Sequence, residues 1–126
     1  MAGWRALGIL AAVLPAGALA AGPAAAGPAD VTKVEILRTG ESFRFDVSVR
    51  HDDSGPEHFV DRWEVVLPDG TVIGTRVLLQ PHPAEQPFTR SLGGVLVPDS
   101  ERSVRVRAHE TVTGFGGKEI TVSIPR

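Results

Sequence analysis

The sequence contains no cysteine, and its single methionine is Met1. Disulfides therefore cannot hold the fold, and neither a thiol nucleophile nor a thiolate metal site is available. Catalytic signatures are also missing, because no GxSxG elbow occurs and no serine stands in a recognisable arrangement with a base. We therefore expect that the chain is not an enzyme. A small hydrolase ranks last among the alternatives.

Neither sign of charge dominates the chain. The 13 Lys and Arg residues face 15 Asp and Glu residues, which gives a formal net charge of −2. Proteins that bind nucleic acid usually concentrate basic residues in a patch or stripe. No such concentration is present, so a nucleic-acid partner is not expected.

The sequence also lacks an apolar run long enough for a comfortable membrane span. Its longest apolar stretch, residues 6–20, follows Arg5 and is interrupted by Pro15 and Gly17. This layout predicts a signal peptide over residues 1–20, and an uncleaved anchor is the alternative. No cysteine follows for lipid attachment. The protein is then periplasmic or secreted, without stable membrane insertion after cleavage.

The remaining chain divides into a short linker and one domain. Residues 21–30 are rich in Ala, Gly and Pro and are expected to form the cleavage region and linker. Residues 31–126 show period-two alternation, as in Phe43, Phe45 and Val47, and no helical periodicity. Turn residues separate seven predicted strands, at about residues 31–38, 42–50, 61–67, 71–79, 88–97, 103–109 and 118–124. We predict an all-β, seven-stranded antiparallel sandwich of two sheets.

Two features carry a resemblance to known proteins. Trp63, on the third predicted strand, resembles the core tryptophan of immunoglobulin-like domains, and the missing cysteine pair directs the likeness to the broad immunoglobulin or fibronectin III class. The segment 81–90, PHPAEQPFTR, is similar to small exported bacterial proteins of uncharacterised function. The resemblance implies an immunoglobulin-like sandwich and no particular activity.

The four histidines of the chain are His51, His58, His82 and His109. Because strands alternate in direction, the segments that follow the second, fourth and sixth strands meet at one pole of the sandwich, and all four histidines lie there. Acidic residues accompany them in the same segments, namely Asp52, Asp53, Glu57, Glu85 and Glu110. Imidazole and carboxylate together suit Zn(II), Cu(II) or Ni(II).

We predict an exported binding module with a divalent metal site, Zn or Cu(II), that uses His58, His82 and His109, completed by His51 or Glu85. His51 is the doubtful member, because it falls in the inward phase of its strand. Histidines bonded only to neighbouring carboxylates are the simpler alternative. A further alternative is a metal-free protein-interaction or envelope assembly module with an unknown protein partner. It would use the same loop end, around Phe115, or a sheet edge.

Overall fold

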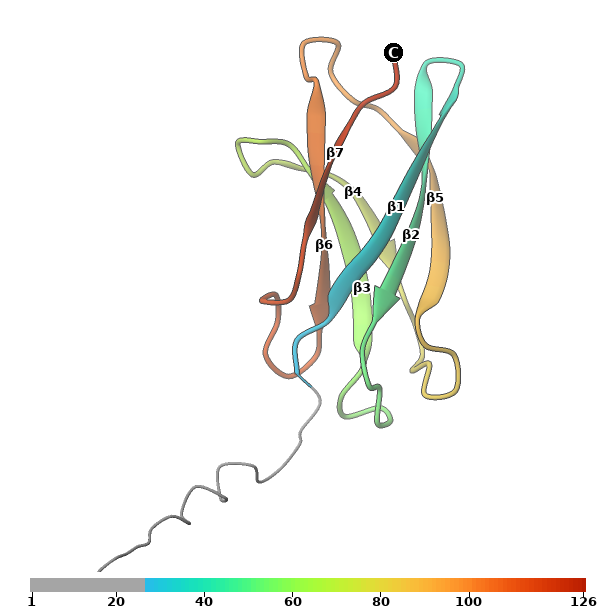
Figure 1. Ribbon diagram of the computed structural model, residues 1–126, viewed down its shortest axis with the longest axis vertical. Coiled ribbons are helices and arrows are strands. Elements are labelled where there is room, and N and C mark those ends of the chain that lie inside the picture. Colours follow the sequence, from blue (N-terminus) through green and yellow to red (C-terminus); the bar gives the residue numbers. More distant parts are fainter. Residues whose placement is uncertain (1–26) are drawn as a thin grey trace, which may run out of the picture.

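The computed structural model describes residues 27–126, so the predicted signal peptide and most of the linker lie outside the described residues. Within this range the chain forms seven strands and no helix (Figure 1). The strands are β1 (Asp30–Thr39), β2 (Ser42–Arg50), β3 (Val60–Val66), β4 (Val72–Val77), β5 (Phe88–Val95), β6 (Ser103–Glu110) and β7 (Ile120–Ser123). They build two antiparallel sheets, which confirms the predicted all-β sandwich.

One sheet has the strand order β1-β2-β5 and the other the order β4-β3-β6-β7. In constant-type immunoglobulin domains the fourth strand belongs to the sheet of the first two strands. Here β4 pairs with β3 instead, with Arg62 opposite Val77 and Val65 opposite Gly74. The sandwich therefore has three strands in one layer and four in the other.

The core lies between the sheets and is built by the inward-facing residue of each alternating pair. Trp63 of β3, Phe45 of β2 and Phe88 of β5 are the largest apolar side chains that are fully buried. Each such side chain contributes about 1.5–3 kcal/mol through removal from water. Trp63 thus occupies the central position that its resemblance implied.

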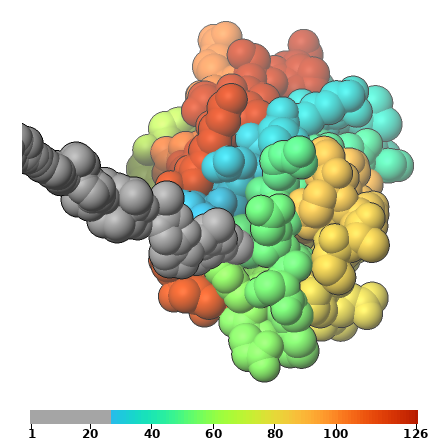
Figure 2. Space-filling model, turned by 60° about the horizontal axis from the view of Figure 1, so that its bottom comes forward, coloured from blue at the N-terminus to red at the C-terminus, as the bar shows by residue number. Residues whose placement is uncertain are grey.

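The loops between β2 and β3, between β4 and β5, and between β6 and β7 lie at the same end of the sandwich (Figure 1). We call this end the histidine pole and define it by residues 51–59, 78–87 and 111–119. Figure 2 shows the β2–β3 segment in green beside the β4–β5 segment in yellow at this end. The predicted gathering of the histidine-bearing segments at one pole is therefore correct.

Gly117 allows two segments far apart in sequence to meet at this pole. The Val31 amide donates to the Lys118 carbonyl at 2.8 Å, and the Lys118 amide donates to Oδ1 of Asp30 at 2.7 Å. A Cβ atom on Gly117 would lie 1.8 Å from the carbonyl oxygen of Ala29. Only glycine permits this approach without backbone movement.

Gly117→Ala is therefore expected to lower the free energy of unfolding by about 1–3 kcal/mol, the usual cost of forcing extra atoms into a packed region. Urea unfolding measures the effect. Gly93→Ala is the matched control, because a Cβ at Gly93 has no neighbour within 4 Å. Equal unfolding midpoints for the two variants would contradict this packing argument.

Candidate metal centre

His51 continues the inward-facing row of β2 beyond its last apolar residue. Phe45, Val47 and Val49 precede it at alternate positions, and all of them are buried. The His51 side chain is 1% exposed. Its Nδ1 lies 2.6 Å from Oδ1 of Asp53, whereas its Nε2 is buried and has no hydrogen-bond partner. The apolar row of β2 thus ends in a polar group whose second nitrogen remains unpaired.

Glu110 occupies the corresponding position on the opposite sheet. It is the last residue of β6, follows the buried Val106 and Ala108 at alternate positions, and is 0% exposed. Its Oε1 accepts hydrogen bonds from the amides of Val112 at 2.8 Å and Gly114 at 3.1 Å, and from both the amide and the hydroxyl of Thr113. The turn after β6 therefore occupies one carboxylate oxygen and leaves Oε2 facing the core.

Burial alone would raise the pKa of the Glu110 carboxyl. The hydrogen bonds from the Thr113 amide and hydroxyl, together with the hydrogen bond and charge interaction with His58, outweigh burial and lower this pKa from 4.5 to about 2. Glu110 is thus a carboxylate at neutral pH, which is the form that binds a metal ion.

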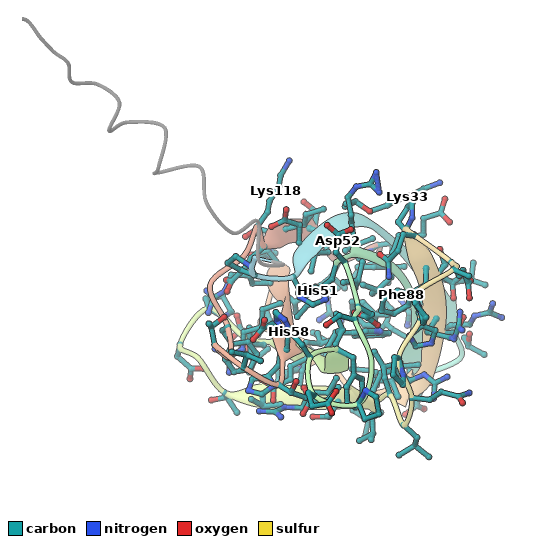
Figure 3. All side chains as sticks on the ribbon, turned by 90° about the horizontal axis from the view of Figure 1, so that it is seen from below. Lys33, His51, Asp52, His58, Phe88 and Lys118 are labelled. Carbon is teal, nitrogen blue, oxygen red and sulfur yellow. The ribbon has the colours of Figure 1, made fainter. Side chains whose placement is uncertain are left out.

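His58 brings the third donor to the same place. It lies in the β2–β3 loop, where its backbone pairs with Gly55, and its Nε2 hydrogen-bonds Oε2 of Glu110. The same oxygen lies 3.5 Å from Nε2 of His51. Viewed from below, His51 and His58 lie side by side near the middle of the sandwich, whereas Lys33 and Lys118 extend from its rim (Figure 3). Two nitrogens and one carboxylate oxygen therefore converge.

Asp53 connects this cluster to the β4–β5 loop. Its carboxylate is 0% exposed and accepts hydrogen bonds from the amides of Val60 at 3.3 Å and His82 at 2.7 Å, besides its contact with His51. The His82 ring stacks on Phe88 with 4.2 Å between ring centroids, and its Nδ1 lies 3.8 Å from Asp53. His82 is thus a neighbour of the cluster through Asp53.

The predicted ligands His109 and Glu85 lie away from this cluster, and each contacts a different charged residue. His109 faces outward from β6, and its Nδ1 lies 2.5 Å from Oδ1 of Asp61. Glu85 forms an ion pair with Arg90 at 3.2 Å. Among residues 27–126, the one group of three or more candidate ligands within 4.8 Å of one another is His51, His58 and Glu110. The structure thus keeps two of the predicted histidines together and does not bring His82, His109 or Glu85 into the group.

Phe115, the expected aromatic of the loop end, folds back over the outer face of β6. The Arg107 guanidinium lies 4.2 Å from its ring centroid, and the His109 ring meets it edge-on at 4.8 Å. A cation over an aromatic face is attracted by the negative charge of that face. Phe115 is thereby engaged within the domain and is only partly available for contact with another protein.

The donor set of the cluster matches borderline metal ions. Imidazole nitrogen and carboxylate oxygen bind Zn(II) at about 2.0–2.2 Å, so that neighbouring donors around one ion lie roughly 3–3.5 Å apart. The 3.5 Å between His51 and Glu110 falls in this range. A buried His/His/Glu group that could hold a metal is therefore present, and three protein donors are the number found in zinc sites that keep one position open.

Comparison with known proteins finds similarity to a protein that is named only as a putative lipoprotein. No family model matches it. It is 37% identical over 83 residues to a protein of Halomicrobium mukohataei named "Putative lipoprotein", which covers 66% of this chain. The chain spans only 40% of that relative's length. The expected likeness to an uncharacterised group of proteins is thus supported, whereas a bacterial origin and membership of the immunoglobulin class stay predictions.

Solved structures resemble the chain at the level of the fold. A hypothetical protein from Pyrococcus horikoshii OT3 superposes with a TM-score of 0.52 and 19% identity, over 79% of this chain and 90% of that one. A superoxide reductase from Nanoarchaeum equitans does so with a TM-score of 0.47 and 14% identity, over 75% and 91%. At these identities the first likeness concerns the fold alone, and neither likeness assigns a reaction to this chain.

The prediction that the chain is not an enzyme is wrong, because it excluded every kind of catalysis. It relied on missing catalytic motifs, but a protein that is named as an enzyme is among the similar structures. Such motifs identify hydrolases and related nucleophilic enzymes, and a metal-dependent enzyme needs none of them. Their absence therefore says nothing about catalysis at a metal centre.

Proposed function

We propose that this domain binds a divalent transition metal ion, Zn(II) or Cu(II), through Nε2 of His51, Nε2 of His58 and Oε2 of Glu110. One observation carries the proposal: Nε2 of His51 is buried, has no hydrogen-bond partner and lies 3.5 Å from a carboxylate oxygen. An unpaired buried nitrogen is costly, because it does not regain the hydration it has lost. An ion between the two groups would give this nitrogen a partner.

The charge of the buried cluster supports a cation. With neutral imidazoles, the carboxylate of Glu110 within the cluster and that of Asp53 beside it carry a formal charge of −2, and both side chains are 0% exposed. Buried charges in proteins are paired or coordinate metals. A divalent ion would neutralise the pair. Nε2 of His58 would have to lose the proton that it donates to Glu110, to solvent or to its own Nδ1, before both atoms could coordinate the ion.

We further propose that the protein is exported, as a periplasmic, secreted or envelope-associated module. The layout of residues 1–20 supports this, as does the name of the Halomicrobium mukohataei relative. Among residues 27–126 no helix is long and apolar enough to cross a membrane.

Calorimetric titration of the domain with Zn(II) and Cu(II) tests the proposal. We expect binding well below the millimolar range. His58→Ala should weaken it at least about 100-fold, because even the loss of an outer-shell partner typically costs 10–100-fold in metal affinity. His109→Ala is the matched control, since His109 is also partly exposed and also bonds a carboxylate, but lies outside the cluster.

Three results would contradict the proposal: binding no tighter than millimolar, equal losses in the two variants, or protein purified from its native compartment without bound metal. Binding no tighter than millimolar would favour the metal-free interaction module instead.

An observation also supports this second candidate function, a metal-free interaction module. The edge strand β4 exposes Val72 and Val77, and Leu79, just beyond it, is 88% exposed.

A further inference from the structure

We infer that Asp53 is a positioning residue of this centre, which fixes the proton of the His51 ring on Nδ1 and so presents an unprotonated Nε2 to the metal. The inference rests on the proposed metal-binding function. It is carried by the contacts of Asp53, which differ from those of every other residue around His51.

The Asp53 carboxylate is held so that it can only face the His51 ring. Oδ1 lies 2.6 Å from Nδ1 of His51 and also accepts from the Val60 amide, while Oδ2 accepts from the His82 amide. These contacts come from β3 and from the β4–β5 loop as well as from His51 itself. An ionised carboxylate accepts hydrogen bonds and donates none, so the proton between Asp53 and His51 must reside on Nδ1.

The position of this proton decides what the other nitrogen can do. A neutral imidazole carries one ring proton, and a metal binds the nitrogen that lacks it. With the proton on Nδ1, Nε2 of His51 presents a lone pair in the direction of Glu110, where no donor meets it. Metal-binding histidines commonly donate their second N–H to a carboxylate in this way, which orients the ring and raises its basicity.

Gln86 supplies the matched control. It also joins His51 to the β4–β5 loop, since its Oε1 accepts from the His51 amide at 2.7 Å and its Nε2 donates to the His82 carbonyl at 2.9 Å. Both residues therefore link the same loops, but Gln86 bonds the backbone of His51 and Asp53 bonds its ring. If Asp53 only holds the loops together, replacing Asp53 or Gln86 should have similar effects on the His51 tautomer and on Zn(II) affinity. If Asp53 positions the His51 ring, only the replacement of Asp53 should change them.

The experiment compares the wild type with Asp53→Asn, Asp53→Ala and Gln86→Ala. Nitrogen-15 chemical shifts of the histidine rings in the metal-free protein are recorded well above the usual histidine pKa of about 6.5. Zn(II) affinity and thermal unfolding are then measured for each protein. An asparagine must turn its NH₂ toward the His51 ring or toward the His82 amide, because it has lost one acceptor oxygen. The first orientation displaces the proton from Nδ1 to Nε2.

We expect His51 of the wild type to be protonated on Nδ1. Asp53→Asn should shift this proton toward Nε2 and lower the Zn(II) affinity roughly 10–100-fold. Gln86→Ala should keep the wild-type tautomer and the wild-type Zn(II) affinity. A wild-type His51 protonated on Nε2 overturns the inference even if Asp53→Asn fails to fold. Wild-type Zn(II) affinity in Asp53→Ala, which has no acceptor for the Nδ1 proton, also overturns it. If wild-type protein keeps the Nδ1 proton but binds no Zn(II), the proposed metal function fails and the ring-orienting contact stands.

Discussion

Replacing Glu110 with alanine is expected to abolish metal binding and to lower the free energy of unfolding by about 2–4 kcal/mol. The carboxylate is both a proposed ligand and the acceptor for the turn after β6. Without it, the amides of Val112 and Thr113 lose their acceptor, and water can replace it only in part because the site is buried. His58 loses its partner as well.

Glu110→Gln separates the two roles. Glutamine keeps one oxygen that accepts from the turn amides, but it removes the negative charge and the oxygen that faces the histidines. We expect the glutamine variant to lose metal binding together with the stabilisation that the carboxylate charge supplies, but to keep the acceptor for the turn amides and so to be more stable than the alanine variant. Urea unfolding in the presence of a chelator and calorimetric titration measure the two effects. Metal binding by either variant near wild-type affinity would exclude Glu110 as a ligand.

Acid is expected to destabilise the metal-free domain as the pH falls from 4.5 toward about 2. The pKa of Glu110 is about 2 in the folded protein, below its ordinary value of 4.5. A group whose pKa is lowered by folding stabilises the folded state fully above the ordinary pKa and loses that contribution as the pH falls through the folded value. At 1.36 kcal/mol per unit, this contribution amounts to about 3 kcal/mol.

Urea unfolding at a series of pH values, with a chelator present, measures this loss. Glu110→Gln is the control, because Glu64 and Asp46, whose carboxyl pKa values are also lowered, remain in both proteins. The difference between the two curves therefore isolates Glu110. Parallel curves between pH 4.5 and about 2 would show that Glu110 does not titrate as its contacts require.

The fold could be predicted from the sequence because its determinants are local. Alternation of Phe43, Phe45, Val47 and Val49 with polar residues predicts both ends of β2 correctly. The turn residues Pro68-Asp69-Gly70 follow the third strand, as predicted. The sequence pattern does not predict that β4 pairs with β3 instead of β5. That choice depends on contacts between residues far apart in the chain, which alternation does not encode.

The candidate site was predicted only in part, and strand phase explains the difference. His51 was considered doubtful because it falls in the inward phase of β2, yet that phase is what buries it against the opposite sheet. His109 faces outward and so meets Asp61, while its neighbour Glu110 faces inward. Extending the inward rows of β2 and β6 one step past their apolar residues would have paired His51 with Glu110.

The contacts of Asp53 could not be predicted in this way. It lies in a loop, and it meets the His82 amide only because the turn between β4 and β5 returns to the same pole. Loop geometry depends on the whole chain around it. Alternation continued past His51 distinguishes the buried Asp53 from the exposed Asp52, but it does not predict which groups Asp53 contacts.

The two inward rows that end in His51 and Glu110 belong to β2 and β6, and these strands lie in opposite sheets. In antibody domains a disulfide joins the second and sixth strands of the sandwich. An ion held by His51 and Glu110 would cross-link the same two strands in a chain that has no cysteine. Such a cross-link would open with acid or chelation, and it would contain no S–S bond.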